Sequence, residues 1–272
     1  STLKVKLFLK KIKMQYLQKK YIEVNWLIFY FIIVISWTFV FLMILASNSV
    51  EGVEYFYGSD FLATLCQPIY KISDWPYAFL MWSIMGIAMM VPTIYPTLKT
   101  YNDLSNVNNV SNLGFASVIV GFIVIWIIFS VIASLMQVYL TQISLIKTDG
   151  IFINFIPSVT LLFLAALYQF SNLKKTCLYR CRHPLLFFLN DWNGSVKTSF
   201  FVGLKVGFFC LGCCWLLMML AFVGGVMNLG FMALATLVMI AEKLPVFGRY
   251  VTLPLSFLLL ISGSIVVISN LI

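Results

Sequence analysis

Three cysteines lie close together in one long apolar stretch near the C-terminus, and they are the residues best suited to chemistry. The stretch Gly203–Met219 contains Cys210, Cys213 and Cys214. Residues three and four apart are neighbours on a helix, so Cys210, Cys214 and Met218 share one face, and Cys213 lies one residue off it. Thiolates and thioethers select soft metals such as Cu(I), and paired thiols can also cycle between dithiol and disulfide. The pattern predicts either a soft-metal site or thiol redox chemistry.

A second pair of cysteines, Cys177 and Cys181, stands in the polar connector before this stretch. Their four-residue spacing places both thiols on one face if the connector is helical. If the connector also folds back against the apolar stretch, the two groups of thiols meet and form one site for a soft metal. The alternative is that all five cysteines are small buried hydrophobic residues without a ligand.

Charged residues near these cysteines are predicted to support a thiolate site. Lys174, Arg182 and Lys205 are placed to offset the negative charge of thiolates. Glu242 lies near the end of an apolar segment, where an ionisable residue is usually paired with an opposite charge. We expect Glu242 to pair with Lys205, because both fall in the same half of one helical hairpin.

Several kinds of active site are excluded by the residues that the chain lacks. His183 is the only histidine, so sites built from several imidazoles are ruled out. The sequence contains no Walker loop, dinucleotide-binding glycine motif or Gly-x-Ser-x-Gly motif. Acidic residues are almost absent from the apolar segments, which disfavours proton- or sodium-coupled transport. These absences favour a binding or assembly protein over an enzyme.

The composition is that of an integral membrane protein. The 272 residues are 62% hydrophobic and 10% charged, and the mean hydropathy is +1.00. A soluble domain carries about 25% charged residues. The lipid bilayer is therefore the expected surrounding. The net charge of +9 is expected to segregate to one side of the membrane, and it does not indicate nucleic-acid binding.

The apolar segments predict an all-α bundle of about seven membrane spans. Residues 1–24 form a basic amphipathic segment suited to a membrane surface, and residues 25–272 form the transmembrane helical domain. The expected spans are roughly Asn25–Ala46, Trp75–Tyr95, Leu113–Leu140, Ile151–Phe170, Thr198–Phe222, Met227–Leu244 and Val251–Leu271.

The distribution of positive charge predicts the orientation of the bundle. With the N-terminus in the cytoplasm and seven alternating spans, all Lys and Arg residues except Lys71 and Lys147 fall on the cytoplasmic side. Positive residues are enriched in cytoplasmic loops of membrane proteins. We therefore expect a cytoplasmic N-terminus.

Five segments resemble a bacterial family of predicted metal-binding integral membrane proteins, a family of unknown function. The resemblance covers roughly residues 75–250 and is carried by paired cysteine motifs. The matching segments are Trp82-x2-Met85-x2-Ala88-Met89-Met90-x-Pro92, Tyr168-Gln169-x4-Lys174-x2-Cys177-Leu178-x2-Cys181-Arg182-x-Pro184, Gly207-x2-Cys210-x-Gly212-Cys213-Cys214-Trp215-x2-Met218, and Gly225-x-Met227-Asn228-Leu229 with the later Glu242-Lys243. The resemblance implies that these segments form one metal-binding unit, but it supplies neither the metal nor an activity. We expect the chain in the cell inner (cytoplasmic) membrane.

Three functions remain open at this point. The first is a soft-metal protein, for copper as Cu(I) or else zinc, with Cys177, Cys181, Cys210, Cys213, Cys214 and Met218 as ligands, acting in metal handling or assembly. The second is an accessory subunit of a larger membrane complex. The third is a membrane thiol–disulfide oxidoreductase. For each we expect a membrane protein partner or a homo-oligomer.

Overall fold

The computed structural model describes residues 24–45, 65, 72–107, 113–147, 150–188, 194–226, 228–245 and 248–271. The predicted amphipathic segment at residues 1–24 lies outside the described residues except for its last position. Cys66 and Met227, the first residue of the expected sixth span, also lie outside them.

The described chain is helical, and its only β feature is a single bridge between Ile146 and Phe152. A first helix covers Val24–Leu45. The following elements are η1 (Ile72–Asp74), α3 (Trp75–Met90), η2 (Val91–Ile94), α4 (Tyr95–Val107), α5 (Leu113–Gln142), α6 (Phe155–Phe170), α7 (Asn172–Arg182), α8 (Leu185–Phe188), α9 (Val196–Met219), α10 (Ala221–Gly224), α11 (Leu229–Lys243) and α12 (Gly248–Leu271).

Five helical segments of the described chain are long and apolar enough to cross a membrane, and a bent pair raises this to six. The bent pair is α6 with α7, whose axes differ by 62°. The predicted sixth span corresponds to α11, which has 15 residues and is about 22 Å long, short of a hydrocarbon core of about 30 Å. The all-helical class is therefore confirmed for the described residues. The count of seven spans and the orientation of the N-terminus stay predictions.

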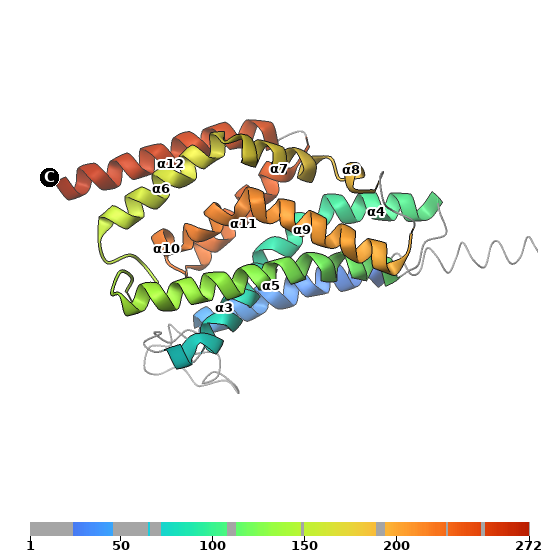
Figure 1. The fold of residues 1–272 in the computed structure, drawn as a ribbon, viewed down its shortest axis with the longest axis horizontal. Coiled ribbons are helices and arrows are strands. Elements are labelled where there is room, and N and C mark those ends of the chain that lie inside the picture. The colour runs from blue at the N-terminus through green and yellow to red at the C-terminus, as the bar shows by residue number, and fades with distance from the viewer. Residues whose placement is uncertain are drawn as a thin grey trace, which may run out of the picture.

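Helices α5 and α9 pack closely because glycines face each other between them (Figure 1). A Cβ atom on Gly203 would lie 2.3 Å from the carbonyl oxygen of Val118, and one on Gly121 would lie 2.3 Å from that of Phe200. Small residues of this kind allow backbones to approach in helical membrane proteins. This crossing fixes the position of α9, the helix that carries three of the cysteines.

Helix α6 ends at a sharp bend that redirects the chain toward α9. Ser171 has an extended backbone, and its side chain accepts a hydrogen bond from the backbone N–H of Lys174, which starts α7 with a helix cap. As a result α6 runs beside α12, while α7 lies against α9 (Figure 1). The bend brings the connector cysteines to the apolar stretch, as the folding-back hypothesis requires.

A second break lies between α3 and α4. Pro92 stands inside the short 3-10 helix η2, which follows directly on α3. A proline cannot donate a backbone hydrogen bond, so a regular α-helix is interrupted there. The break turns the buried hydroxyl of Thr93 toward α9 and α11, where it meets polar groups of both helices.

Candidate metal centre

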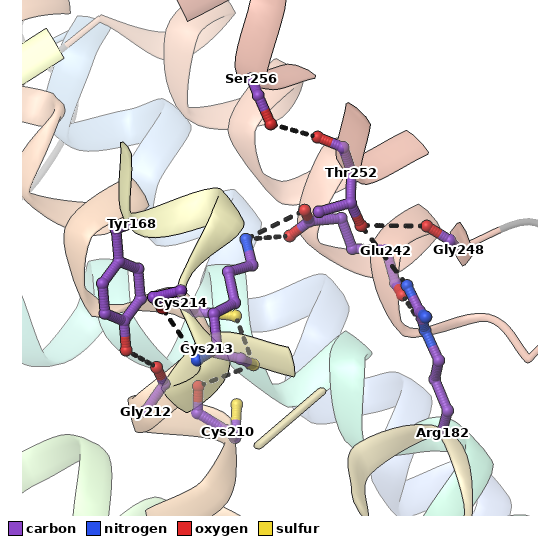
Figure 2. A network of polar contacts seen from close by, with 12 residues as sticks. Tyr168, Arg182, Cys210, Gly212, Cys213, Cys214, Glu242, Gly248, Thr252 and Ser256 are labelled. Atoms are coloured by element: carbon purple, nitrogen blue, oxygen red, sulfur yellow. Dashed lines mark hydrogen bonds and ion pairs between the residues drawn. The ribbon is translucent and has the colours of Figure 1, made fainter. Parts of the chain in front are cut away.

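The three cysteines of α9 form a compact buried group. Cys210, Cys213 and Cys214 are each 1% exposed. The thiol of Cys213 donates to the backbone carbonyl of Cys210 over 3.1 Å, and its sulfur lies 3.2 Å from that of Cys214. Figure 2 shows the three side chains near one another along about one turn of α9. The structure therefore brings together the thiols that the sequence pattern placed on and beside one face.

A lysine that was not among the expected site residues reaches this group. Lys243, the last residue of α11, is 3% exposed, and its Nζ atom lies 2.8 Å from the sulfur of Cys210. The same ammonium donates to the hydroxyl of Thr93 over 2.7 Å. A positive charge at this distance favours a thiolate over a thiol. Cys210 is therefore held by groups from η2, α9 and α11.

The two cysteines of α7 approach the same region from the other side. Cys177 and Cys181 are 8% and 6% exposed, somewhat more than the cysteines of α9. The sulfur of Cys177 packs against Gly212, where an added Cβ atom would lie 2.7 Å from it. The thiol of Cys181 interacts with that of Cys213. The folding back of the connector thus places one thiol of α7 beside the α9 group.

Glu242 is buried next to this region, but its partner is not the one expected. Its carboxylate accepts from Nζ of Lys174 over 3.0 and 2.9 Å, and both side chains are 1% exposed. The expected pairing with Lys205 is wrong, because Lys205 lies on the exposed face of α9 while the bend at Ser171 carries Lys174 inward. The ion pair joins α7 to α11.

Arg182 strengthens the same junction through the backbone. Its Nε atom donates to the carbonyl oxygen of Glu242 over 2.9 Å, and its Nη2 atom lies 3.5 Å from the hydroxyl of Thr252 on α12. Figure 2 shows Arg182 and Gly248 on the side of Glu242 away from Tyr168. The guanidinium thereby fastens the end of α7 to the turn between α11 and α12.

Tyr168 links α6 to the cysteine region. Its hydroxyl donates to the carbonyl oxygen of Gly212, and its ring packs edge-on against that of Trp215, with centroids 5.8 Å apart. Met218 lies one turn beyond Cys214 on α9 and is buried. The helix around the thiols is therefore held on several sides before any ion binds.

The described residues contain no group of three or more His, Cys, Asp or Glu side chains arranged to hold a metal ion. A soft monovalent ion needs fewer ligands than that, and thiolates are the ligands it prefers. Two sulfurs on opposite sides of one ion are about 4.6 Å apart, twice a metal–sulfur bond. Cys213 and Cys214, at 3.2 Å, must therefore separate by side-chain rotation to admit an ion. The donor set fits a two-thiolate site better than a four-ligand one.

Two residues of this centre, Lys243 and Thr93, were missed by reasoning from the sequence. Lys243 follows Glu242 at the end of an apolar helix, so a signal was present, but the helix end was expected at the membrane surface. Thr93 follows Pro92, and a proline in an apolar helix marks a place where polar groups are freed. Both contacts join residues more than 30 positions apart, which sequence spacing alone does not reveal.

Comparison with known proteins connects this chain with copper. Residues 79–266 match the model of the PpoB2 family, described as copper chaperones. The match covers more than half of the chain, and the chain belongs to this family. It includes every residue of the centre described above. No curated protein and no solved structure matches. The expected relation to a metal-related family is supported, although the family named is not the one expected.

Proposed function

We propose that this chain is a membrane-embedded binding protein that holds Cu(I) with the thiols of α9 and passes it to an acceptor, without itself being an enzyme. The observation that carries the proposal is the convergence of Cys210, Cys213 and Cys214 in an apolar interior, with the ammonium of Lys243 2.8 Å from one sulfur. Family membership favours copper over zinc among the ions that thiolates bind.

The cysteines of α7 are proposed as the route by which the ion reaches and leaves the α9 thiols. Cys177 and Cys181 are less deeply buried than the α9 cysteines, and Cys181 interacts with Cys213. A soft ion can move between thiolates that share it for a moment, because one sulfur binds before another leaves. Met218 is proposed as a further, thioether ligand for the ion on α9.

The other charged residues have separate parts in this proposal. The charge of Lys174 is matched by Glu242, so Lys174 positions α7 and does not neutralise thiolates directly. Arg182 holds the end of α7 to α11 through the carbonyl oxygen of Glu242. Lys205 lies on the exposed face of α9. Its proposed role is to orient that helix, and it has little effect on the thiols.

We further propose that the chain is a multi-pass protein of the cell inner membrane, with seven spans and a cytoplasmic N-terminus. The segregation of Lys and Arg residues supports this orientation. The acceptor of the ion would be another membrane protein or a second copy of the chain.

Metal analysis of the gently extracted full chain tests the proposal. Purification without chelator should yield copper close to one ion per chain, with α9 thiols protected from alkylation until a Cu(I) chelator is added. The Cys210→Ser, Cys214→Ser double variant should lose the copper, whereas Cys66→Ser, outside both cysteine-bearing helices, should keep it. Unchanged copper in the double variant would overturn the proposal.

The same preparation distinguishes the two other functions. A stoichiometric partner that remains bound to a metal-free chain would favour an accessory subunit. Thiols that switch between reduced and disulfide-bonded forms with the redox state, without any metal, would favour an oxidoreductase.

A further inference from the structure

Lys243 is a buried cation whose acceptors in the described part of the chain are not carboxylates. Its Nζ atom contacts the sulfur of Cys210 and the hydroxyl of Thr93. The adjacent carboxylate, that of Glu242, is taken by Lys174 through both oxygens. A buried charge without a counter-charge is costly. Lys243 is therefore balanced only when negative charge resides on the thiols beside it.

The charge of the loaded centre depends on the charge of the ion. Two thiolates with a monovalent ion carry one negative charge, which the ammonium of Lys243 neutralises. Two thiolates with a divalent ion are already neutral, and the ammonium then leaves one positive charge in the apolar interior. In both cases the two thiols release their protons when the ion binds. The centre is thus neutral only with a monovalent ion.

The number of thiolate ligands matters, because with three thiolates the centre would be neutral with a divalent ion and negative with a monovalent one. We take two thiolates as the ligands, because the described residues contain no group of three metal-binding side chains already arranged around one point. The neighbouring pair Lys174–Glu242 adds no net charge. Arg182 is only half-buried, and its Nε atom donates to a backbone carbonyl. Lys243 is consequently the charge that decides the balance.

We propose that Lys243 is a specificity-determining residue that makes the thiol centre select soft monovalent cations over divalent ones. This inference rests on the proposed function, because it takes the α9 thiols as the ligands. It adds a reason, based on charge and not on the softness of sulfur, why Cu(I) is preferred to Zn(II). Cd(II) is a divalent ion that thiolates also bind readily. A comparison of Cu(I) with Cd(II) therefore tests the effect of ionic charge between two soft ions.

The test compares affinities for Cu(I) and Cd(II) in the full chain in detergent, under anaerobic reducing conditions and against chromogenic competitors. Lys243→Met keeps the length of the side chain but removes its charge. We expect it to lower the Cu(I) affinity roughly tenfold to a hundredfold, the range for a lost hydrogen bond to a charged group, and to leave the Cd(II) affinity equal or higher. Lys243→Arg, which keeps the positive charge, should have a ratio of Cu(I) affinity to Cd(II) affinity close to that of the wild type. Lys197→Met, which removes an exposed charge from α9, the helix of the thiols, should match the wild type.

Each outcome decides the inference. An equal loss of affinity for both ions, or no loss, in Lys243→Met would overturn it. If that variant does not fold, Lys243→Gln, which still donates to Thr93, replaces it, with circular dichroism as the check on folding. In the wild type alone, equal affinity for Cu(I) and Cd(II) also overturns the inference. If the wild type binds neither ion, the proposed function itself fails, which is a different result.

Discussion

Glu242 and Lys243 are consecutive in the chain, yet their side chains hold two different cysteine-bearing helices. Glu242 pairs with Lys174 on α7, and Lys243 contacts Cys210 on α9. The C-terminal end of α11 is therefore a junction through which α7 and α9 are kept in register. A substitution that breaks either contact should therefore change the positions of both groups of thiols.

Glu242→Gln should strongly destabilise the protein. The substitution leaves the ammonium of Lys174 buried without its counter-charge, which costs about 3–5 kcal/mol when one partner of a buried pair is removed. The midpoint of thermal unfolding in detergent measures the loss. The double variant Lys174→Met, Glu242→Met should recover much of it, because an apolar pair of similar volume needs no counter-charge. A Glu242→Gln midpoint equal to that of the wild type would contradict the buried pairing.

Gly212→Ala should push α7 away from α9. The new Cβ atom would lie 2.7 Å from the sulfur of Cys177, and overpacking of this kind costs about 1–3 kcal/mol. The unfolding midpoint is again the measurement. Gly86→Ala is the matched control, because its Cβ atom would make only an ordinary contact of 3.5 Å with Ser130. Adding Cys177→Ala to Gly212→Ala should relieve the clash, and additive losses in the double variant would count against it.

Thr93→Val should weaken the contact that holds Lys243. Valine has nearly the same shape but cannot accept the hydrogen bond of 2.7 Å from the ammonium, so we expect a loss of about 1.5–3 kcal/mol in stability. Thr236→Val is a suitable control, since that buried hydroxyl bonds to the backbone of its own helix. Equal effects of the two substitutions would show that Lys243 does not depend on Thr93.

The order in which the thiols react should follow their burial. Cys177 and Cys181 are more exposed than Cys210, Cys213 and Cys214, so a small maleimide should modify the α7 thiols first in the folded, metal-free protein. Peptide mapping by mass spectrometry after increasing times gives the order. Faster modification of the α9 thiols would contradict the proposed route through α7.

The sequence predicted which helices carry the site better than it predicted how they meet. Long apolar runs and the spacing of Cys210 and Cys214 depend on residues close in the chain, so the helices and their thiol face followed from periodicity. The partner of Glu242 depends on the bend at Ser171, a single extended residue that redirects α7. Periodicity does not report such a bend, and the expected pairing with Lys205 failed for that reason.

Lys243 illustrates the same limit within the candidate centre. A lysine at the end of an apolar helix is ordinarily placed at the membrane surface, where its charge is solvated. Here α11 is short, and its last residue turns inward to meet η2 and α9. The inward position of Lys243 follows only from the packing of three separate segments. The roles of the cysteines and Met218 as ligands remain predictions that a metal-binding experiment would test.

The contact between Lys243 and Cys210 also constrains how this protein can change in evolution. Losing the cysteine first would leave the ammonium of Lys243 in an apolar interior without the sulfur beside it, and losing the lysine first would remove the positive charge beside that sulfur. We expect either single loss to destabilise the folded chain, so a change at one position should be followed by a change at the other. Among descendants of one ancestor, the two residues are expected to be inherited, or abandoned, as a pair.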